Sequence, residues 1–219
     1  MRTFDDIVLT ASDGTEVRGD LAVPPEPRAA AIVCHPHPQY GGTRRDHVVG
    51  ALYTLLPDLG IAALRFDFRS RFDDGRGERL DAEAALGELR ARLPGIPHLA
   101  VGYSFGAMIA LGLAPGAEAA DDSVAAVLAV APPLTMAAGR VPPPTVPTLL
   151  VVPAHDQFCD PDAARAAAGD WPHVSIATVE MADHFLRGRT AAMAEAATAW
   201  LEDLLPAGSA PRDAGISPR

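Results

Sequence analysis

The stretch "HLAVGYSFGAMIALGLA", residues 98–114, decides the fold. An apolar segment, 98–104, runs directly into a helical segment, 105–114, and a serine stands between two glycines at the junction. Residues 102–106 match the pattern G-x-S-x-G. A serine on a sharp strand-to-helix turn takes a strained backbone conformation, and flanking side chains would collide with the adjacent strand or helix. The stretch therefore predicts a buried strand, a tight turn that exposes Ser104, and a helix packed behind it.

The rest of the chain repeats this alternation of strand and helix. The turn Ser12-Asp13-Gly14 predicts a hairpin within residues 4–24. Further strands are predicted at 29–36, 61–69, 123–133, 147–155 and 173–180, and further helices at 44–60, 81–95, 161–169 and 189–205. This order predicts an α/β fold: a doubly wound, mostly parallel sheet with an N-terminal hairpin. The Pro-rich stretch 132–147 predicts a loop, which leaves no room for a substantial lid.

Length and composition narrow the class of protein. The 219 residues suit a single α/β domain over 1–205, and residues 206–219 are too poor in apolar side chains to pack, so we expect a flexible tail. The formal net charge of -10 argues against a nucleic-acid partner. We expect neither a membrane partner nor a signal peptide, because no apolar run approaches about 20 residues and the first residues are acidic. The expected location is cytoplasmic.

A serine hydroxyl is a poor nucleophile unless a base takes its proton. Of the seven histidines, only His184 falls in the loop after the last predicted strand. Loops at the carboxyl ends of parallel strands converge on one edge of the sheet, so His184 and Ser104 can meet there. We therefore expect His184 to be the base.

A carboxylate should orient the imidazole and stabilise its charged form. Asp156 follows the strand at 147–155 directly, so its side chain can reach the same edge. Asp160 precedes Pro161 and has the position of a helix cap. We favour Asp156 and keep Asp160 as the alternative.

Acyl transfer also needs N–H donors for an oxyanion. The first is the backbone N–H of Phe105, at the start of a helix. The second should lie in "CHPHPQYGGTRRD", residues 34–46, where Pro36 and Pro38 have no N–H and His37 between them does. A metal site in "HPHP" is the competing interpretation, but no Cys, His or Asp set with ligand spacing accompanies it. We expect no metal and no cofactor.

Apolar side chains near these segments could line a substrate pocket. For most of them, packing in the core is the competing interpretation. The candidates are Tyr40, Phe72, Leu134, Met136, Phe158 and Phe185.

Three separated motifs carry a resemblance to a known family: "HPHPQYGG" at 35–42, "GYSFGA" at 102–107 and "ADHFLRGR" at 182–189. With them the chain resembles the small lidless bacterial hydrolases of the α/β-hydrolase superfamily over nearly its whole length. The resemblance implies a catalytic triad of Ser104, Asp156 and His184, in the chain order of that superfamily. The chain is also similar to the dienelactone hydrolases, which use a cysteine where this chain has Ser104.

One segment departs from the family pattern. Such hydrolases usually carry "NFRGVGxSxG" after the fourth strand, and this chain has "DFRSRFDDGRGE" at 67–78, with Ser70 in place of the first glycine. The resemblance therefore implies the chemistry of the site but not the shape of one pocket wall.

These observations predict a serine hydrolase that acts on small ester or related acyl substrates through an acyl-enzyme. A peptidase or amidase of the same fold is one alternative, and a non-catalytic binding protein on a hydrolase scaffold is another. The expected partner is a small-molecule acyl substrate. A homo-oligomer is compatible with the sequence, since a partner subunit could cover the lidless edge.

Overall fold

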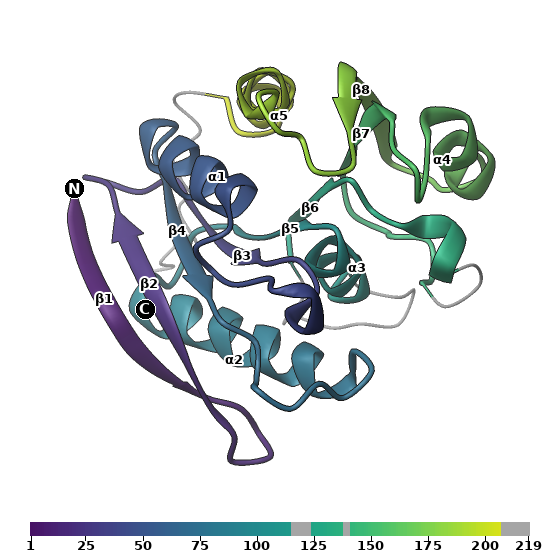
Figure 1. Cartoon of the computed structure of the whole chain (residues 1–219). Helices are drawn as coiled ribbons and strands as arrows, with labels where there is room; N and C mark the ends of the chain where they lie inside the picture. Colours follow the sequence, from purple (N-terminus) through teal and green to yellow (C-terminus); the bar gives the residue numbers. More distant parts are fainter. Residues whose placement is uncertain (115–123, 138–140, 207–219) are drawn as a thin grey trace, which may run out of the picture.

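An eight-stranded sheet forms the centre of the computed structural model, in the order β1-β2-β4-β3-β5-β6-β7-β8 (Figure 1). The structure describes residues 1–114, 124–137 and 141–206. The strands are β1 (Arg2–Thr10), β2 (Glu16–Val23), β3 (Ala29–Cys34), β4 (Ile61–Phe66), β5 (His98–Tyr103), β6 (Ala126–Val130), β7 (Thr148–His155) and β8 (Val174–Asp183). β2 pairs antiparallel with β1 and β4, and all other pairs are parallel. The predicted mostly parallel sheet with an N-terminal hairpin is confirmed.

Helices cover both faces of the sheet, as a doubly wound fold requires (Figure 1). α1 (His47–Asp58) and α5 (Thr190–Leu204) pack on one face, where their side chains, such as Leu52 and Leu201, join one buried cluster. α2 (Arg76–Arg92), α3 (Phe105–Gly112) and α4 (Pro161–Ala168) pack on the other face, with Leu86, Ala107 and Ala164 in a second cluster. Two apolar layers thus hold the sheet between them.

Some element boundaries differ from the prediction. α2 begins at Arg76 and not at residue 81, because the Glu78 carboxylate accepts the N–H groups of Asp73 and Gly75 (2.9 Å each) and so caps the helix start. A short 3₁₀ helix, Leu134–Ala137, interrupts the predicted loop 132–147, of which residues 138–140 lie outside the described part. All but the first residue of the predicted tail 206–219 also lies outside it.

The sheet has a switch point between β3 and β5. β3 lies between β4 and β5, so the chain leaves β3 toward β4 and leaves β5 toward β6, in opposite directions. Crevices at such points, at the carboxyl ends of the strands, are the usual ligand sites of open α/β sheets. Cys34 at the end of β3 is in register with Gly102 on β5. The segment that follows Cys34 therefore lies beside the turn that carries Ser104.

Candidate active site

Ser104 occupies a sharp turn between β5 and α3. Its backbone has φ 56° and ψ -118°, a conformation that a non-glycine residue adopts only under strain. A side chain at Gly102 would come within 2.1 Å of the Gly106 carbonyl oxygen, and one at Gly106 within 2.3 Å of the Cys34 carbonyl oxygen. Only glycine fits at either position, and this packing is why the serine is flanked by glycines.

Strand pairing brings the base and the carboxylate together. His155, the last residue of β7, is in register with Asp183, the last residue of β8. Asp156 and His184 each follow directly, so they leave the sheet side by side. An irregularity in the pairing between Pro153 and His155, together with the positive φ of Met181 (53°), allows this arrangement.

The three side chains form one continuous chain of hydrogen bonds. Ser104 Oγ lies 2.8 Å from His184 Nε2, and His184 Nδ1 lies 2.8 Å from Asp156 Oδ2. Since a carboxylate only accepts, Nδ1 carries the proton and donates to Asp156, which leaves Nε2 to accept from the serine hydroxyl. The Asp156 side chain is 1% exposed and that of His184 is 6% exposed. The arrangement can draw a proton from Ser104 while water is kept from the carboxylate.

Of the two predicted carboxylates, the structure brings only Asp156 to His184. Its second oxygen, Oδ1, accepts the backbone N–H groups of Phe158 (2.8 Å) and Cys159 (3.2 Å), which fix the side chain. Asp160 caps α4 instead, accepting the N–H of Ala163 (2.8 Å).

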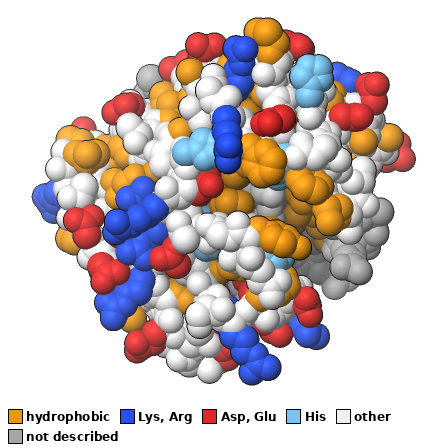
Figure 2. Space-filling model, in the orientation of Figure 1, with side chains coloured by type: hydrophobic (Ala, Val, Ile, Leu, Met, Phe, Trp, Pro, Cys, Tyr) orange, Lys and Arg blue, Asp and Glu red, His pale blue; other side chains and the backbone are white. Residues whose placement is uncertain are grey.

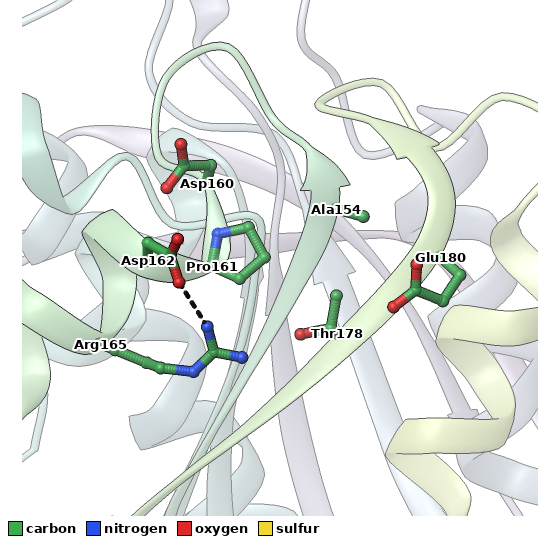
Figure 3. Close-up of a pocket in the computed structure, with 7 residues that line it drawn as sticks. All are labelled: Ala154, Asp160, Pro161, Asp162, Arg165, Thr178 and Glu180. Atoms are coloured by element: carbon green, nitrogen blue, oxygen red, sulfur yellow. Dashed lines mark hydrogen bonds and ion pairs between the residues drawn. The ribbon is translucent and has the colours of Figure 1, made fainter.

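Asp160 also borders a hollow beside α4 that holds none of the three triad side chains. The hollow has a volume of about 310 Å³, and Figure 3 shows its lining, in which the ion pair of Asp162 and Arg165 is prominent. Its residues are Ala154, Asp160, Pro161, Asp162, Arg165, Thr178 and Glu180. Neither predicted oxyanion donor is among them, so this hollow is separate from the candidate site.

Two side chains that the sequence did not single out anchor the loop of the base. The Tyr103 hydroxyl donates to the His184 carbonyl (3.0 Å), and burial raises the pKa of Tyr103, which keeps it a donor. His47 Nε2 lies 2.8 Å from the Phe185 carbonyl oxygen. No sequence signal marks His47 for this role. Tyr103 is the residue before Ser104, and this position alone could have marked it as a residue of the site.

The two residues predicted to donate to the oxyanion, Phe105 and His37, contact each other through their side chains. The Phe105 N–H is the first of α3 and has no acceptor within the helix. The His37 ring packs against Phe105 (4.9 Å between ring centroids) and against Phe72 (4.5 Å). Burial lowers the pKa of the His37 imidazole. The segment after β3 thus lies against the start of α3, where Phe105 follows Ser104.

Exposed apolar side chains surround the site. Figure 2 shows hydrophobic side chains gathered in the middle of the face on view. The Phe158 ring packs edge-on against His184 (4.6 Å) and the Phe185 ring does the same from 5.6 Å, and both residues are about two-fifths exposed, at 40% and 44%. Tyr40 and Met136 are more exposed still.

One predicted pocket residue, Leu134, is buried and does not belong to these exposed side chains. Leu134 is 3% exposed and belongs to the buried cluster on the α2, α3 and α4 face. It packs in the core below the loop that carries Met136, so a substrate cannot contact it. The spacing of apolar residues around it could not distinguish these two roles.

The segment 67–78, where the sequence departs from the family pattern, is fixed by ion pairs. Arg69 bonds the fully buried Asp81 (Nη2–Oδ1 2.8 Å) and also Asp13 (Nη1–Oδ2 2.7 Å). Asp67 accepts from the Arg44 guanidinium (2.5 Å). Phe72 of the same segment packs against His37, so the segment lies beside the residue predicted to supply the second oxyanion donor.

The described residues contain neither a metal-binding cluster nor a membrane-spanning helix. No group of three or more His, Cys, Asp or Glu side chains there is placed to hold a metal ion. No helix in those same ranges has both the length and the apolar character to cross a membrane.

Comparisons with known proteins agree with this geometry. No protein-family model matches the chain. An uncharacterised protein of Rickettsia prowazekii is 30% identical over 203 residues, which cover 84% of each chain. An α/β serine hydrolase homologue from Coxiella burnetii is 27% identical, with a TM-score of 0.80 over 90% of this chain and 96% of that one. An α/β serine hydrolase without a lid from Xanthomonas campestris is 28% identical, with a TM-score of 0.79 over 92% and 95%. The chain therefore belongs to the family of the Rickettsia protein and, with these structures, to the α/β-hydrolase superfamily.

Proposed function

We propose that this protein is a serine hydrolase that cleaves small carboxylic esters through an acyl-enzyme. The observation that carries the proposal is the unbroken hydrogen-bond chain from Ser104 through His184 to the buried Asp156. The likeness to two bacterial proteins described as α/β serine hydrolases supports the same chemistry.

The residues divide the reaction between them. His184 Nε2 takes the hydroxyl proton as Ser104 Oγ attacks the ester carbonyl, and Asp156 stabilises the imidazolium that forms. The carbonyl oxygen becomes an oxyanion, which the N–H groups of Phe105 and His37 bind. The C–O bond to the alcohol then breaks, the alcohol leaves with the proton from His184, and the acyl group stays on Ser104.

The second half of the reaction repeats the steps with water. His184 takes a proton from a water molecule, whose oxygen attacks the acyl carbonyl. Collapse of that intermediate returns the proton to Ser104 Oγ and releases the carboxylic acid. The steps use only these side chains, the two backbone N–H groups and water.

The rim of the site suits small apolar substituents. Tyr40, Phe72, Phe158 and Phe185 supply aromatic surface near Ser104, and all of them except the half-buried Phe72 are exposed to solvent. Burying an apolar group against it stabilises the complex by about 25 cal/mol for each Å² removed from water. We therefore expect short acyl or aryl esters to be preferred over long-chain lipids, which need an enclosed tunnel.

Turnover of p-nitrophenyl acetate tests the proposal. The wild-type protein should hydrolyse the ester and should be labelled by a fluorophosphonate, whereas Ser104→Ala should do neither. Ser175→Ala is the matched control, because Ser175 is exposed near the opposite end of β8 from His184. Equal rates in the wild type and Ser104→Ala would contradict the proposal.

A matched pair of substrates separates the ester from the amide alternative. The p-nitroanilide of the same acyl group presents the same carbonyl with a poorer leaving group. We expect the ester to be the better substrate by kcat/KM, and a preference for the anilide would favour the peptidase or amidase instead. Absence of fluorophosphonate labelling would favour the binding protein.

A further inference from the structure

We propose that His35 is a positioning residue that sets the direction of the His37 N–H in the oxyanion hole. The inference rests on the proposed function, because it assigns a cause to one donor of that site. His35 lies directly after the end of β3 and is 1% exposed.

Both ring nitrogens of His35 are occupied. The backbone N–H of Phe68 donates to Nε2 (2.9 Å), so Nε2 carries the lone pair and Nδ1 carries the proton. Nδ1 lies 2.6 Å from the carbonyl oxygen of Pro36 and therefore donates to it. The ring is held further by the Phe68 ring, whose centroid lies 4.6 Å away. One neutral imidazole thus joins the segment after β4 to the segment after β3.

The bond to Pro36 acts on His37 through the peptide plane. The carbonyl of Pro36 and the N–H of His37 belong to the same rigid, planar group and point in opposite directions. When His35 holds the carbonyl on one side, the N–H must face the other side. The rings of Pro36 and Pro38 restrict the backbone around this group further.

The neutral state of His35 is favoured by its surroundings. Burial lowers the pKa of the imidazole, against the opposing effects of the Asp67 and Asp46 carboxylates. A protonated ring would present an N–H to the Phe68 N–H and would lose that bond. The imidazole is therefore suited to hold both segments at once.

Two substitutions separate the two bonds of His35. The amide nitrogen of asparagine stands as many bonds from Cβ as Nδ1 does, so His35→Asn keeps a donor for the Pro36 carbonyl. The amide oxygen of glutamine stands as many bonds from Cβ as Nε2 does, so His35→Gln keeps an acceptor for the Phe68 N–H. Each variant retains one bond and loses the other.

The kinetic comparison of these variants tests the proposal with p-nitrophenyl acetate. His35→Gln should lower kcat at least about tenfold with little change in KM, because it loses the bond to the Pro36 carbonyl that orients the His37 N–H, a donor that acts in the transition state. His35→Asn keeps that bond, and its kcat should stay within about threefold of the wild type. His35→Leu, which lacks both bonds, should lose at least as much kcat as His35→Gln and serves if that variant does not fold. Equal kcat in the asparagine and glutamine variants, with similar losses of Tm, would show a merely structural role and overturn the proposal.

A double-mutant cycle identifies His37 as the target. His37→Pro removes the N–H, and His37→Ala removes the ring but keeps the N–H. The loss of kcat caused by His35→Gln should vanish in the His37→Pro background and persist in the His37→Ala background. The same loss in both backgrounds would overturn the proposal.

Different results would overturn the role of His35 and the proposed function. A wild type that hydrolyses the ester, an inactive Ser104→Ala and a fully active His35→Gln would overturn the role of His35 alone. A wild type without turnover or labelling would overturn the proposed function and this inference together.

Discussion

Two polar clusters of the molecule both bury carboxylates, yet they are built for different tasks. The first, the relay, consists of Ser104, His184 and Asp156. The second, the arginine cluster, lies near the β1–β2 edge, the side on which blue and red side chains interleave in Figure 2. In it Arg44 pairs with Asp6, Asp20 and Asp67, and Arg69 pairs with Asp13 and Asp81. Asp156 is 5% exposed in the first, and Asp81 is fully buried in the second.

The difference lies in the partner of each carboxylate. His184 has an imidazole, a group that can take up and return a proton in the course of a reaction. Arg69 has a guanidinium, and its hydrogen bonds with Asp81 raise its pKa still further, so it keeps its proton at all times. The relay can therefore move a proton, whereas the arginine cluster can only hold segments in place. Substitutions should reduce activity in the relay and stability in the arginine cluster.

The largest expected effect separates the two carboxylates of the β7–α4 loop. Asp156→Asn places an amide opposite His184 Nδ1 and favours the wrong tautomer, so kcat should fall by about 10³- to 10⁴-fold. Asp160→Asn is the matched control, because asparagine caps a helix as well as aspartate does. Ester turnover of the two purified variants is the measurement. An inactive Asp160→Asn beside an active Asp156→Asn would assign the third member of the triad to Asp160.

The next effect tests the oxyanion donor. His37 has φ -56°, which suits proline, so His37→Pro deletes the N–H without forcing the backbone. We expect kcat to fall by about 10²- to 10³-fold, as for loss of one oxyanion-hole donor. His37→Ala, which keeps the N–H, should lose much less. Similar kcat values for the two variants would exclude the His37 N–H from the site.

The arginine cluster should respond in stability. Arg69→Met leaves the buried Asp81 carboxylate without its compensating charge, which should cost about 3–5 kcal/mol in the free energy of unfolding measured with urea. The double variant Arg69→Met with Asp81→Leu removes both charges and should recover part of this loss, because the backbone N–H of residue 69 then loses its acceptor. A single variant as stable as the wild type would contradict the structural role of the pair.

The smallest expected effect is a pH dependence of stability. Burial lowers the pKa of His35, His37 and His98 in the folded protein. Between the unfolded pKa of about 6.5 and the lower folded values, the unfolded chain binds more protons. Stability from these groups is therefore complete above about pH 6.5 and is lost as the pH falls toward the folded pKa values. Tm measured from pH 7.5 to pH 5.5 should decrease, and less steeply in His35→Asn, whereas an equal or steeper slope in that variant would contradict the shift.

Local patterns predicted the elements but not the contacts between them. The glycines beside Ser104 and the apolar runs were sufficient for the sheet and the elbow, because their causes are short-range steric clashes and burial. The choice between Asp156 and Asp160 needed the register of His155 with Asp183, which lies 28 residues along the chain. Sequence alone does not contain that pairing.

The same limit explains the residues that were missed or misplaced. The hydrogen bond between His35 and Phe68 joins two loops 33 residues apart. The "HPHP" motif could therefore be recognised in the sequence, but the contact made by its first histidine could not be predicted. The charged sequence of residues 67–78 is typical of a loop throughout, so it did not predict that α2 begins within it. The helix begins there because the Glu78 side chain folds back and accepts the N–H groups of Asp73 and Gly75. Leu134 is buried and Met136, two residues on, is exposed, and the apolar character that they share does not distinguish these positions.

The most direct test of the relay is to trap the acyl-enzyme. The protein is mixed rapidly with p-nitrophenyl acetate, quenched in acid and analysed by peptide mass spectrometry. The chain contains no lysine, so the competing amine is the N-terminal one. We expect one acetyl group on the peptide that contains Ser104, absent in Ser104→Ala and retained in Ser175→Ala. Turnover with acetylation elsewhere, or with equal acetylation of Ser104→Ala, would contradict this expectation.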